Sequence, residues 1–283
     1  MKNHLSLLKS DFIRWLKSDK QMLTFFALIY SYLYVITPMR EYSGYFNEPL
    51  GFTEAFVTLM GNGFSMVVIT ITFLMLIIDF PDMSSNAVFV LYRTGRKRWL
   101  RNQCLFVLFA AFFFMLVLVL FSVITTADIS YSGVNAWSNA VNEINDPVNN
   151  ELKTTYPLGV ADLSIVNNFR PYKATAHCFI LMFLQMTLFG QLQICLTVRF
   201  NRITAMVADI TFLVCGLYFW NSRGEAQWFF TIANSTCGWH FDPLYNITVY
   251  PIRASYAYMI TLNVIVLAAS GFFVRNKSFV LGK

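Results

Sequence analysis

Six long stretches with almost no charged residues constrain the fold of this chain more than any other feature of the sequence. Each stretch has 19 to 26 residues, and a single charged residue, Asp209, interrupts one of them. An α-helix crosses a bilayer core of about 30 Å with roughly 20 apolar residues. Because lipid cannot hydrogen-bond to the backbone and the alternation of barrel strands is absent, the stretches are predicted to be helices. The predicted spans are residues 21–39, 56–78, 103–125, 174–197, 203–221 and 255–274.

The composition agrees with a membrane protein. Only 13% of the residues are charged, whereas soluble domains carry about 25%. The 29 Phe residues exceed what one aqueous core of this size would bury. The five Cys residues include no C-x-x-C pair, which argues against a zinc module. We therefore predict an all-α polytopic membrane protein in which residues 1–283 form one transmembrane domain.

The distribution of Lys and Arg predicts the orientation in the membrane. An even number of spans places both termini on one side, and that side carries 15 basic residues, against six on the other. Basic loops stay in the cytoplasm, so both termini are predicted to be cytoplasmic. The acidic residues show the opposite bias, with four on the terminal side and ten on the other. The net charge of +6 thus reflects orientation in a plasma membrane rather than nucleic-acid binding.

The segment before the first span, residues 1–20, is predicted to be an interfacial helix. It is too long and too helical for a cleavable signal peptide, and no small-residue cleavage site follows the first span. Its apolar residues fall on one face, with basic residues elsewhere, which is typical of a helix lying in the membrane interface. The alternative is a plain cytoplasmic extension of the first span. The apolar face consists of Leu5, Leu8, Phe12, Trp15 and Leu16.

The predicted cytoplasmic loop 80–102 contains a short helix. Pro81 cannot continue the preceding helix, and Ser84 or Ser85 is suited to cap a new one. The new helix is predicted to break near Gly95, which can adopt the left-handed conformation that ends a helix.

This short helix is apolar, although a helix in a cytoplasmic loop has no lipid to cover its apolar side chains. It would present Phe89 and Tyr92, which need the bilayer interface or a partner protein. Alternatively, the basic run that follows, residues 96–101, only enforces topology and contacts anionic lipid.

Two predicted outer loops differ in character. Residues 126–173 are acidic and rich in Asn, whereas residues 223–254 are aromatic. An aqueous loop rarely carries so many aromatic side chains, so we predict that the second loop forms short re-entrant or interfacial helices. Packing of this loop against the acidic loop is the competing interpretation. Cys237 in it and Cys178 in the fourth span could pair, but nothing in the sequence sets their distance.

Signatures of catalysis are missing. The sequence contains no G-x-x-x-x-G-K-[ST], no G-x-G-x-x-G, no H-E-x-x-H and no G-x-S-x-G. The three His residues are far apart in the sequence. We therefore predict that the chain is not an enzyme and holds no metal or other cofactor of its own.

Polar residues within the spans are few. Asp209 is the one acidic residue deep in a span, and such a residue marks a functional site by default. The structural alternative is that Asp209 pairs with a nearby basic residue such as Arg202. Hydrogen bonding between helices is the favoured role for the remaining polar residues, which are Asn62, Ser65, His177, Gln185, Gln191, Gln193 and Asn263.

These features in order resemble the permease subunits of type-2 ATP-binding-cassette exporters of Gram-positive bacteria. The amphipathic first segment, the six spans with both ends inside and the aromatic loop before the last span make this a resemblance of architecture over the whole chain. The motif-like part is Leu91-Tyr92-Arg93-Thr94-Gly95-Arg96-Lys97-Arg98-Trp99. The longer acidic loop 126–173 departs from the simplest family pattern and leaves the substrate class open.

The resemblance implies a homo- or heterodimeric permease in a bacterial plasma membrane, with each copy docked on a separate cytoplasmic ATPase that holds ATP and Mg²⁺. Residues 84–92 would be the coupling helix, 1–20 the connecting helix and 223–254 the outer gate. The substrate path would lie between two copies, lined mainly by the first, second and fifth spans. The implied coupling residues are Ser85, Val88, Phe89, Tyr92, Arg93 and Arg96, and the implied gate residues are Trp228, Phe229 and Trp239.

Three functional hypotheses follow. The leading one is an export permease for a hydrophobic or amphipathic substrate, such as an antimicrobial peptide, a drug or a lipid. The second is a membrane sensor or immunity scaffold that does not transport and binds a ligand through its outer loops. The third is an ion-coupled carrier that uses Asp209, with Gln185 and Asn62 as candidate polar residues of its pathway.

Overall fold

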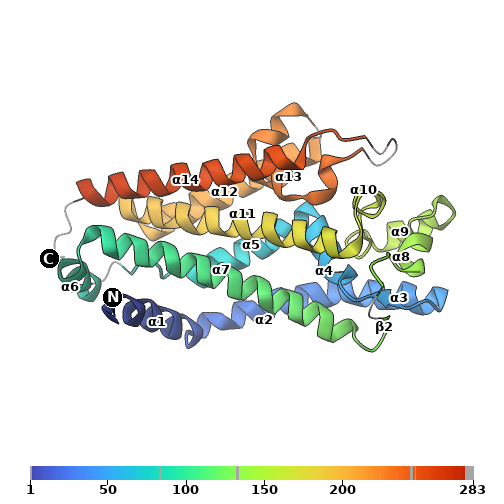
Figure 1. Cartoon of the computed structure of the whole chain (residues 1–283), viewed down its shortest axis with the longest axis horizontal. Coiled ribbons are helices and arrows are strands. Elements are labelled where there is room, and N and C mark those ends of the chain that lie inside the picture. Colours follow the sequence, from blue (N-terminus) through green and yellow to red (C-terminus); the bar gives the residue numbers. More distant parts are fainter. Residues whose placement is uncertain are drawn as a thin grey trace.

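The computed structural model describes residues 2–82, 85–131, 134–222, 224–242, 245 and 247–277. Long helices lie side by side along the molecule (Figure 1). Strands in the described residues are limited to β1 (Leu50–Gly51) and β2 (Ser130–Tyr131), which pair in parallel. The chain is thus almost entirely helical, as the sequence predicts.

Five helical segments are long and apolar enough to cross a membrane, among the residues that the structure describes. Each contains one of the predicted spans and extends it at both ends. The segments are Asp19–Phe46, α7 (Arg96–Thr126), α11 (Pro171–Arg199), α12 (Arg202–Ser222) and α14 (Ile252–Asn276).

The first of these segments changes its helical geometry on the way. Pro38 lacks the N–H group that would bond one turn back, and the turn before it widens into a π-helix. The Thr37 hydroxyl donates to the carbonyl of Tyr32 at 3.0 Å, and the backbone N–H of Thr37 donates to the same carbonyl. The pieces are η1 (Asp19–Gln21), α2 (Met22–Ser31), the π-helix η2 (Tyr32–Ile36) and α3 (Thr37–Phe46).

The predicted second span, 56–78, is not one straight helix, and the bent pair that replaces it is either a broken span or a re-entrant loop. The structure has two helices, α4 (Glu54–Gly61) and α5 (Gly63–Ile77), bent by 89° at Asn62. Asn62 is extended, and its side-chain oxygen accepts from the amides of Phe64 at 2.8 Å and Ser65 at 3.4 Å. A helix start that Asn caps in this way ends the preceding helix, because the capping residue lies outside both.

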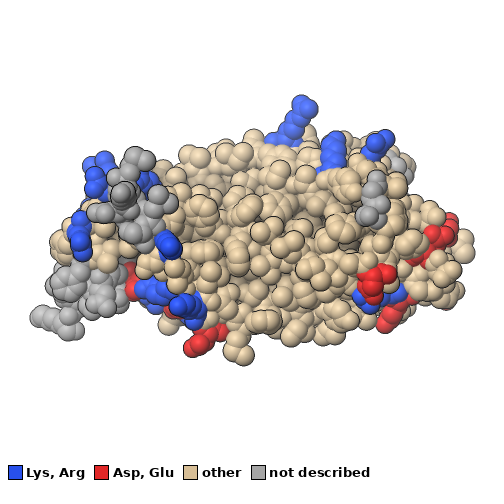
Figure 2. Space-filling model, turned by 60° about the horizontal axis from the view of Figure 1, so that its bottom comes forward, with Lys and Arg blue, Asp and Glu red and all other residues tan. Residues whose placement is uncertain are grey.

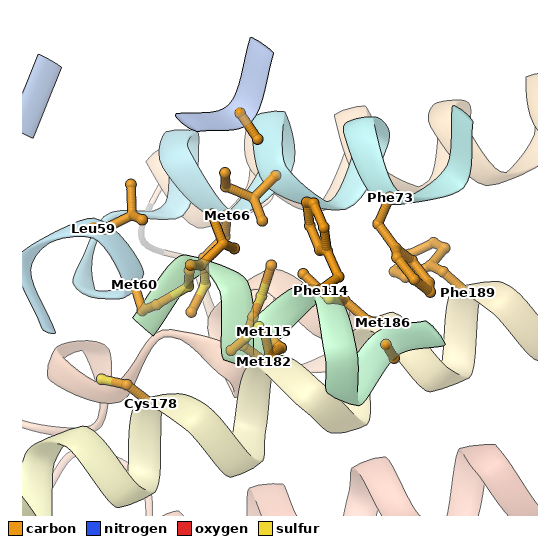
Figure 3. Close-up of a cluster of buried hydrophobic side chains, with 14 of the residues drawn as sticks. Leu59, Met60, Met66, Phe73, Phe114, Met115, Cys178, Met182, Met186 and Phe189 are labelled. Atoms are coloured by element: carbon orange, nitrogen blue, oxygen red, sulfur yellow. The ribbon is translucent and has the colours of Figure 1, made fainter. Parts of the chain in front are cut away.

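Helix α11 is the centre of the bundle. Its most apolar window is 67% buried, and it packs against α4, α5, α7, α12 and α14. Figure 3 shows its Met182, Met186 and Phe189 meeting Phe73 of α5 and Phe114 of α7. Gly190 permits the closest approach, since a Cβ there would lie 2.4 Å from a methyl group of Val107.

The helices at the periphery expose apolar side chains instead. The corresponding windows of α12 and α14 are only 22% and 17% buried. Figure 2 shows charged side chains toward both ends of the molecule, with a band between them on this face that carries none. An uncharged band between two charged ends is typical of a surface that a lipid bilayer covers.

The first helix, α1 (Lys2–Leu16), packs on the bundle beside α7. Trp15 is 2% exposed, and its indole N–H donates to the carbonyl of Leu76 at 3.0 Å. Phe12 and Trp15 both contact the ring of Phe113 edge-on. The predicted amphipathic helix is therefore present, and part of its apolar face is buried against protein.

The two ends of the bundle differ in structure. One end, called the α6 end, carries α1, α6 (Ser85–Thr94) and the last turn of α14 (Figure 1). The opposite end, called the α10 end, carries the two predicted outer loops. The loop 126–173 forms α8 (Asn139–Ile144), η3 (Pro147–Asn149), α9 (Asn150–Thr155) and α10 (Leu163–Asn168), and the loop 223–254 forms η4 (Glu225–Phe229), α13 (Thr231–Ser235) and η5 (Cys237–His240).

Candidate functional site

Helix α6 lies at the predicted position of the coupling helix, and its main neighbour is α7. Leu91 is buried, whereas Tyr92 is 70% exposed and Arg93 is exposed. Gly95 has the predicted positive φ, at +80°, and separates α6 from α7. The backbones of Ser85, Val88 and Phe89 belong to α6, and their side chains lie outside the described residues.

Arg96 takes part in an intramolecular contact at the α6 end. Its guanidinium donates to the backbone carbonyls of Val274, at 3.4 Å, and of Arg275. These carbonyls belong to the last turn of α14, where a cation is favoured by the negative end of the helix dipole. Arg96 therefore joins the start of α7 to the end of the last helix.

An ion-pair network, which the sequence analysis missed, holds the segment that follows α5. Two carboxylates, Asp79 and Asp82, lie in the segment between α5 and α6. Arg14 of α1 pairs with Asp82 at 2.9 Å, and Lys20 pairs with Asp79 at 2.5 Å. Arg202, the first residue of α12, reaches Asp79 at 3.5 Å and Asp82 at 3.6 Å. The signal in the sequence was two acidic residues within three positions of each other in a region otherwise rich in Lys and Arg.

The predicted structural pairing of Asp209 with Arg202 is wrong. Arg202 bonds to Asp79 and Asp82, while Asp209 is fully buried in α12. Neither carboxyl oxygen of Asp209 has a hydrogen-bond partner among the described residues. An ionised carboxylate in such a place is strongly disfavoured, so the group is expected to be neutral at rest.

Several of the other polar residues of the spans connect helices, but the predicted inter-helix bonding of Gln193 is wrong, because neither polar atom of its side chain has a partner among the described residues. Gln185 of α11 donates to the Thr70 hydroxyl of α5 at 2.9 Å, the kind of inter-helix bond that the sequence predicts. His177 bonds to the Tyr256 hydroxyl at 2.7 Å, which joins α11 to α14. Asn62 caps α5, so its side-chain oxygen serves the helix break.

At the α10 end, a buried carboxylate fastens the acidic loop to the start of α4. Glu54 is 0% exposed and accepts three hydrogen bonds. The donors are the amide of Gly51 at 2.7 Å, the amide of Ser138 at 2.6 Å and the Ser138 hydroxyl at 2.8 Å. Gly51 must lack a side chain, because a Cβ would lie 2.6 Å from a Glu54 oxygen.

The aromatic loop folds back into the bundle. Every residue of α13 is buried, and α13 contacts α5, α11, α12 and α14. The loop also contacts α10 of the acidic loop through η5. Both interpretations of this loop therefore describe part of its packing, while its position relative to a membrane stays a prediction.

A chain of buried hydrogen bonds holds this loop against α14. The Ser255 hydroxyl donates to the side-chain oxygen of Asn234 at 2.8 Å and lies 2.8 Å from Nε2 of His240. The amide group of Asn234 donates to the carbonyls of Trp228 and Phe230. Burial lowers the pKa of His240 to about 4, although the carbonyls of Cys237 and Thr236 oppose this shift.

The three predicted gate residues have different surroundings. Phe229 is 77% exposed. Trp228 stacks on Tyr250 with ring centroids 4.1 Å apart, and Trp239 packs on Trp220 of α12 with ring centroids 4.7 Å apart. Their role as a gate stays a prediction. Cys178 and Cys237 are both buried free thiols in side-chain contact with each other.

A cavity of about 790 Å³ lies at the α10 end, between the two loops and the helix break. Such a volume suits a small organic ligand. Its walls come from segments that are far apart in the sequence, and sequence reasoning identified only Asn62 and Trp239 among them. The residues that line it include Asn62, Lys153, Asp162, Trp220, Gln227, Trp239 and Asp242.

Comparison with protein-family models, with curated proteins and with solved structures finds no significant match to this chain. The type-2 exporter resemblance therefore stands as a prediction that rests on the sequence features alone.

Proposed function

We propose that the chain is the membrane-spanning permease subunit of an ATP-binding-cassette exporter. In this proposal it lies in a bacterial plasma membrane with both termini in the cytoplasm, so that the α6 end is cytoplasmic and the α10 end is outside. A separate ATPase subunit holds ATP and Mg²⁺ and drives export. The substrate is a hydrophobic or amphipathic molecule, such as a peptide, a drug or a lipid.

Helix α6 carries this proposal. It is a short helix with an exposed aromatic side chain, Tyr92, at one end of the bundle. The segment that leads from α5 toward it is tied to α1, η1 and α12 through the ion pairs of Asp79 and Asp82. In this proposal a push on α6 by a closing ATPase travels through α7 and through this segment to the first and fifth spans, since rigid elements joined by polar contacts transmit displacement.

The exposed apolar helices support the dimer that this function requires. Helices α2 and α12 present large apolar side chains outward, among them Phe25, Ile29, Val207 and Val214. A second copy seated on this face would place α2, α5 and α12 around a shared path, while lipid covers α14.

The test is co-purification of the tagged chain with candidate ATPase subunits, followed by ATPase measurement in liposomes. Tyr92→Asp should abolish stimulation of the ATPase, because docking of the ATPase would bury the new carboxylate in the interface. Tyr45→Asp is the matched control, because Tyr45 is also 70% exposed and lies on α3 at the opposite end. Failure of every ATPase to bind, or normal coupling in Tyr92→Asp, would contradict the proposal.

A second candidate function is an ion-coupled carrier, which the unpartnered carboxyl of Asp209 favours. A group that is neutral when buried and ionised when hydrated can carry a proton between two states. In proteoliposomes without ATPase, a pH gradient would then drive transport in the wild type and not in Asp209→Asn. Equal transport by both proteins, with the same pH dependence, would remove this candidate.

A further inference from the structure

We propose that the cavity at the α10 end is a binding site for an aromatic organic cation. This inference concerns binding at the cavity alone, so it holds or fails separately from pairing with an ATPase. The cavity combines a volume of about 790 Å³, an aromatic wall and a net negative charge on its lining side chains.

The wall of the cavity is built on the helix break. Trp220, near the end of α12, lies against Gly63, where a Cβ atom would be 2.8 Å from Cε2 of its indole ring. Only Gly at this position lets the ring rest on the first residue of α5. Trp239 packs on Trp220 and its indole N–H donates to Gln227, which fixes the second ring. Two indole rings held at a helix break form a rigid surface, which lowers the ordering cost of binding.

Charge selects the sign of the ligand. Two carboxylates, Asp162 and Asp242, and one ammonium group, Lys153, line the cavity, so their formal sum is −1 −1 +1 = −1. The ammonium group already donates to the side-chain oxygen of Asn145 at 2.9 Å. Asp162 uses one oxygen to accept from the amide of Ser164 at 2.9 Å. An organic cation is attracted both by these carboxylates and by the faces of the indole rings.

Gly238 makes room for the carboxylate of Asp162. A Cβ at Gly238 would lie 2.6 Å from Oδ2 of Asp162. The α10 segment and η5 can therefore approach each other with the carboxyl group between them. Asp162 is thus placed by both loops at once, and the site depends on their packing rather than on either loop alone.

The experiment uses the purified full chain in nanodiscs of uncharged phosphatidylcholine, without any ATPase. The probe is rhodamine 6G, an aromatic cation, and its binding is measured by fluorescence anisotropy after subtraction of empty nanodiscs. Fluorescein has a related ring system with negative charge and serves as the matched probe. Saturable binding of rhodamine 6G, with fluorescein at least about tenfold weaker, is expected from the charge of the site.

Two pairs of variants locate the site. Asp162→Asn keeps the cap on α10 but removes the charge, and should weaken binding about tenfold. Asp146→Asn makes the same change at an exposed cap outside the cavity and should shift the dissociation constant less than about twofold. Trp220→Leu should weaken binding about tenfold, whereas Trp228→Leu, in the loop 223–254 and outside the residues that line the cavity, should not.

Three results would overturn the inference. Rhodamine 6G that binds empty nanodiscs and the protein equally shows partition into lipid only. Equal binding of fluorescein shows that charge does not select the ligand. Equal effects of Asp162→Asn and Asp146→Asn place the binding elsewhere on the molecule.

Discussion

The polar networks described above differ between the two ends of the bundle, although an exposed ion pair between Arg40 and Asp128 also lies at the α10 end. At the α6 end, Asp79 and Asp82 pair with cations while their side chains remain 50% and 26% exposed. At the α10 end, Glu54, Asn234 and His240 are 0% exposed and bond inside the protein. Exposed ion pairs contribute about 0–1 kcal/mol each and exchange partners easily, whereas breaking a buried network costs several times more. The difference indicates an end that can rearrange and an end that stays in one arrangement.

The largest effect is expected from the buried carboxylate. Glu54→Ala leaves two amides and one hydroxyl without their acceptor, so it should lower the free energy of unfolding by about 3–4 kcal/mol. The measurement is unfolding of the purified protein in mixed micelles. Glu143→Ala, which removes an exposed carboxylate from the loop that Glu54 fastens, should change the value by less than about 0.5 kcal/mol. A similar loss in both variants would contradict the contrast between the two ends.

The second-largest effect is expected from acid, which should lower the stability of the α10 end. His240 is neutral in the folded protein because burial lowers its pKa to about 4, while the unfolded value is about 6.5. Protonation then favours the unfolded state, so this stability is complete above pH 6.5 and is lost as the pH falls toward 4. The loss should reach about 3 kcal/mol. The protection of residues 225–242 against hydrogen exchange, after correction for the intrinsic exchange rate, should fall over this range in the wild type.

A variant that cannot titrate isolates this effect. In His240→Gln, the same segment should show exchange rates that change little between pH 6.5 and 4, after correction for intrinsic exchange. An equally steep dependence in the variant would assign the acid sensitivity to another group.

The joint between α6 and α7 should show a smaller effect. Gly95 has φ +80°, a conformation that side chains with a Cβ rarely adopt. Gly95→Ala should therefore lower the free energy of unfolding by about 1–2 kcal/mol, although no atom lies within 4 Å of the added methyl group. Gly44→Ala, in α3, also meets open space but has no positive φ, so it should be neutral or stabilising in the same unfolding assay.

The smallest effect on stability is expected from the exposed network. Asp79→Asn should lower the free energy of unfolding by less than about 1 kcal/mol, and 0.5 M salt should remove most of the difference. The distance between spin labels on α6 and α12 should nevertheless broaden in this variant, because Arg202 loses one of its two anchors. A stability loss as large as that of Glu54→Ala would show that the two ends are held alike.

Much of the fold follows from local sequence patterns. The apolar runs predicted the five long helices, because the need to satisfy backbone groups in an apolar medium leaves few alternatives. The short helix α6 and the positive φ of Gly95 were also predicted, since proline, capping residues and glycine act through neighbouring backbone. The break at Asn62 was missed, although Gly-Asn-Gly is a turn signal, because the surrounding residues are uniformly apolar.

The candidate sites could be predicted only in part. Tyr92 and Trp239 were found because an aromatic side chain in a loop is unusual wherever it lies. Arg202 was assigned to the wrong acid, because sequence distance favoured Asp209 whereas Asp79 and Asp82 lie closer in space. Trp220 was overlooked, since a Trp at the end of a predicted span is ordinary and only packing on Gly63 makes it a cavity wall.

The sequence by itself determined which segments are helical, which of them suit a membrane and which loops are basic, acidic or aromatic. These properties depend on composition and on spacing within about 20 residues. Only the tertiary structure decided which charges pair in the segment after α5 and where two outer loops enclose a cavity. It also decided that the Asp209 carboxyl of α12 has no hydrogen-bond partner among the described residues. Such contacts join residues that are far apart in the chain, and no local pattern specifies which of many chemically suitable partners will be adjacent.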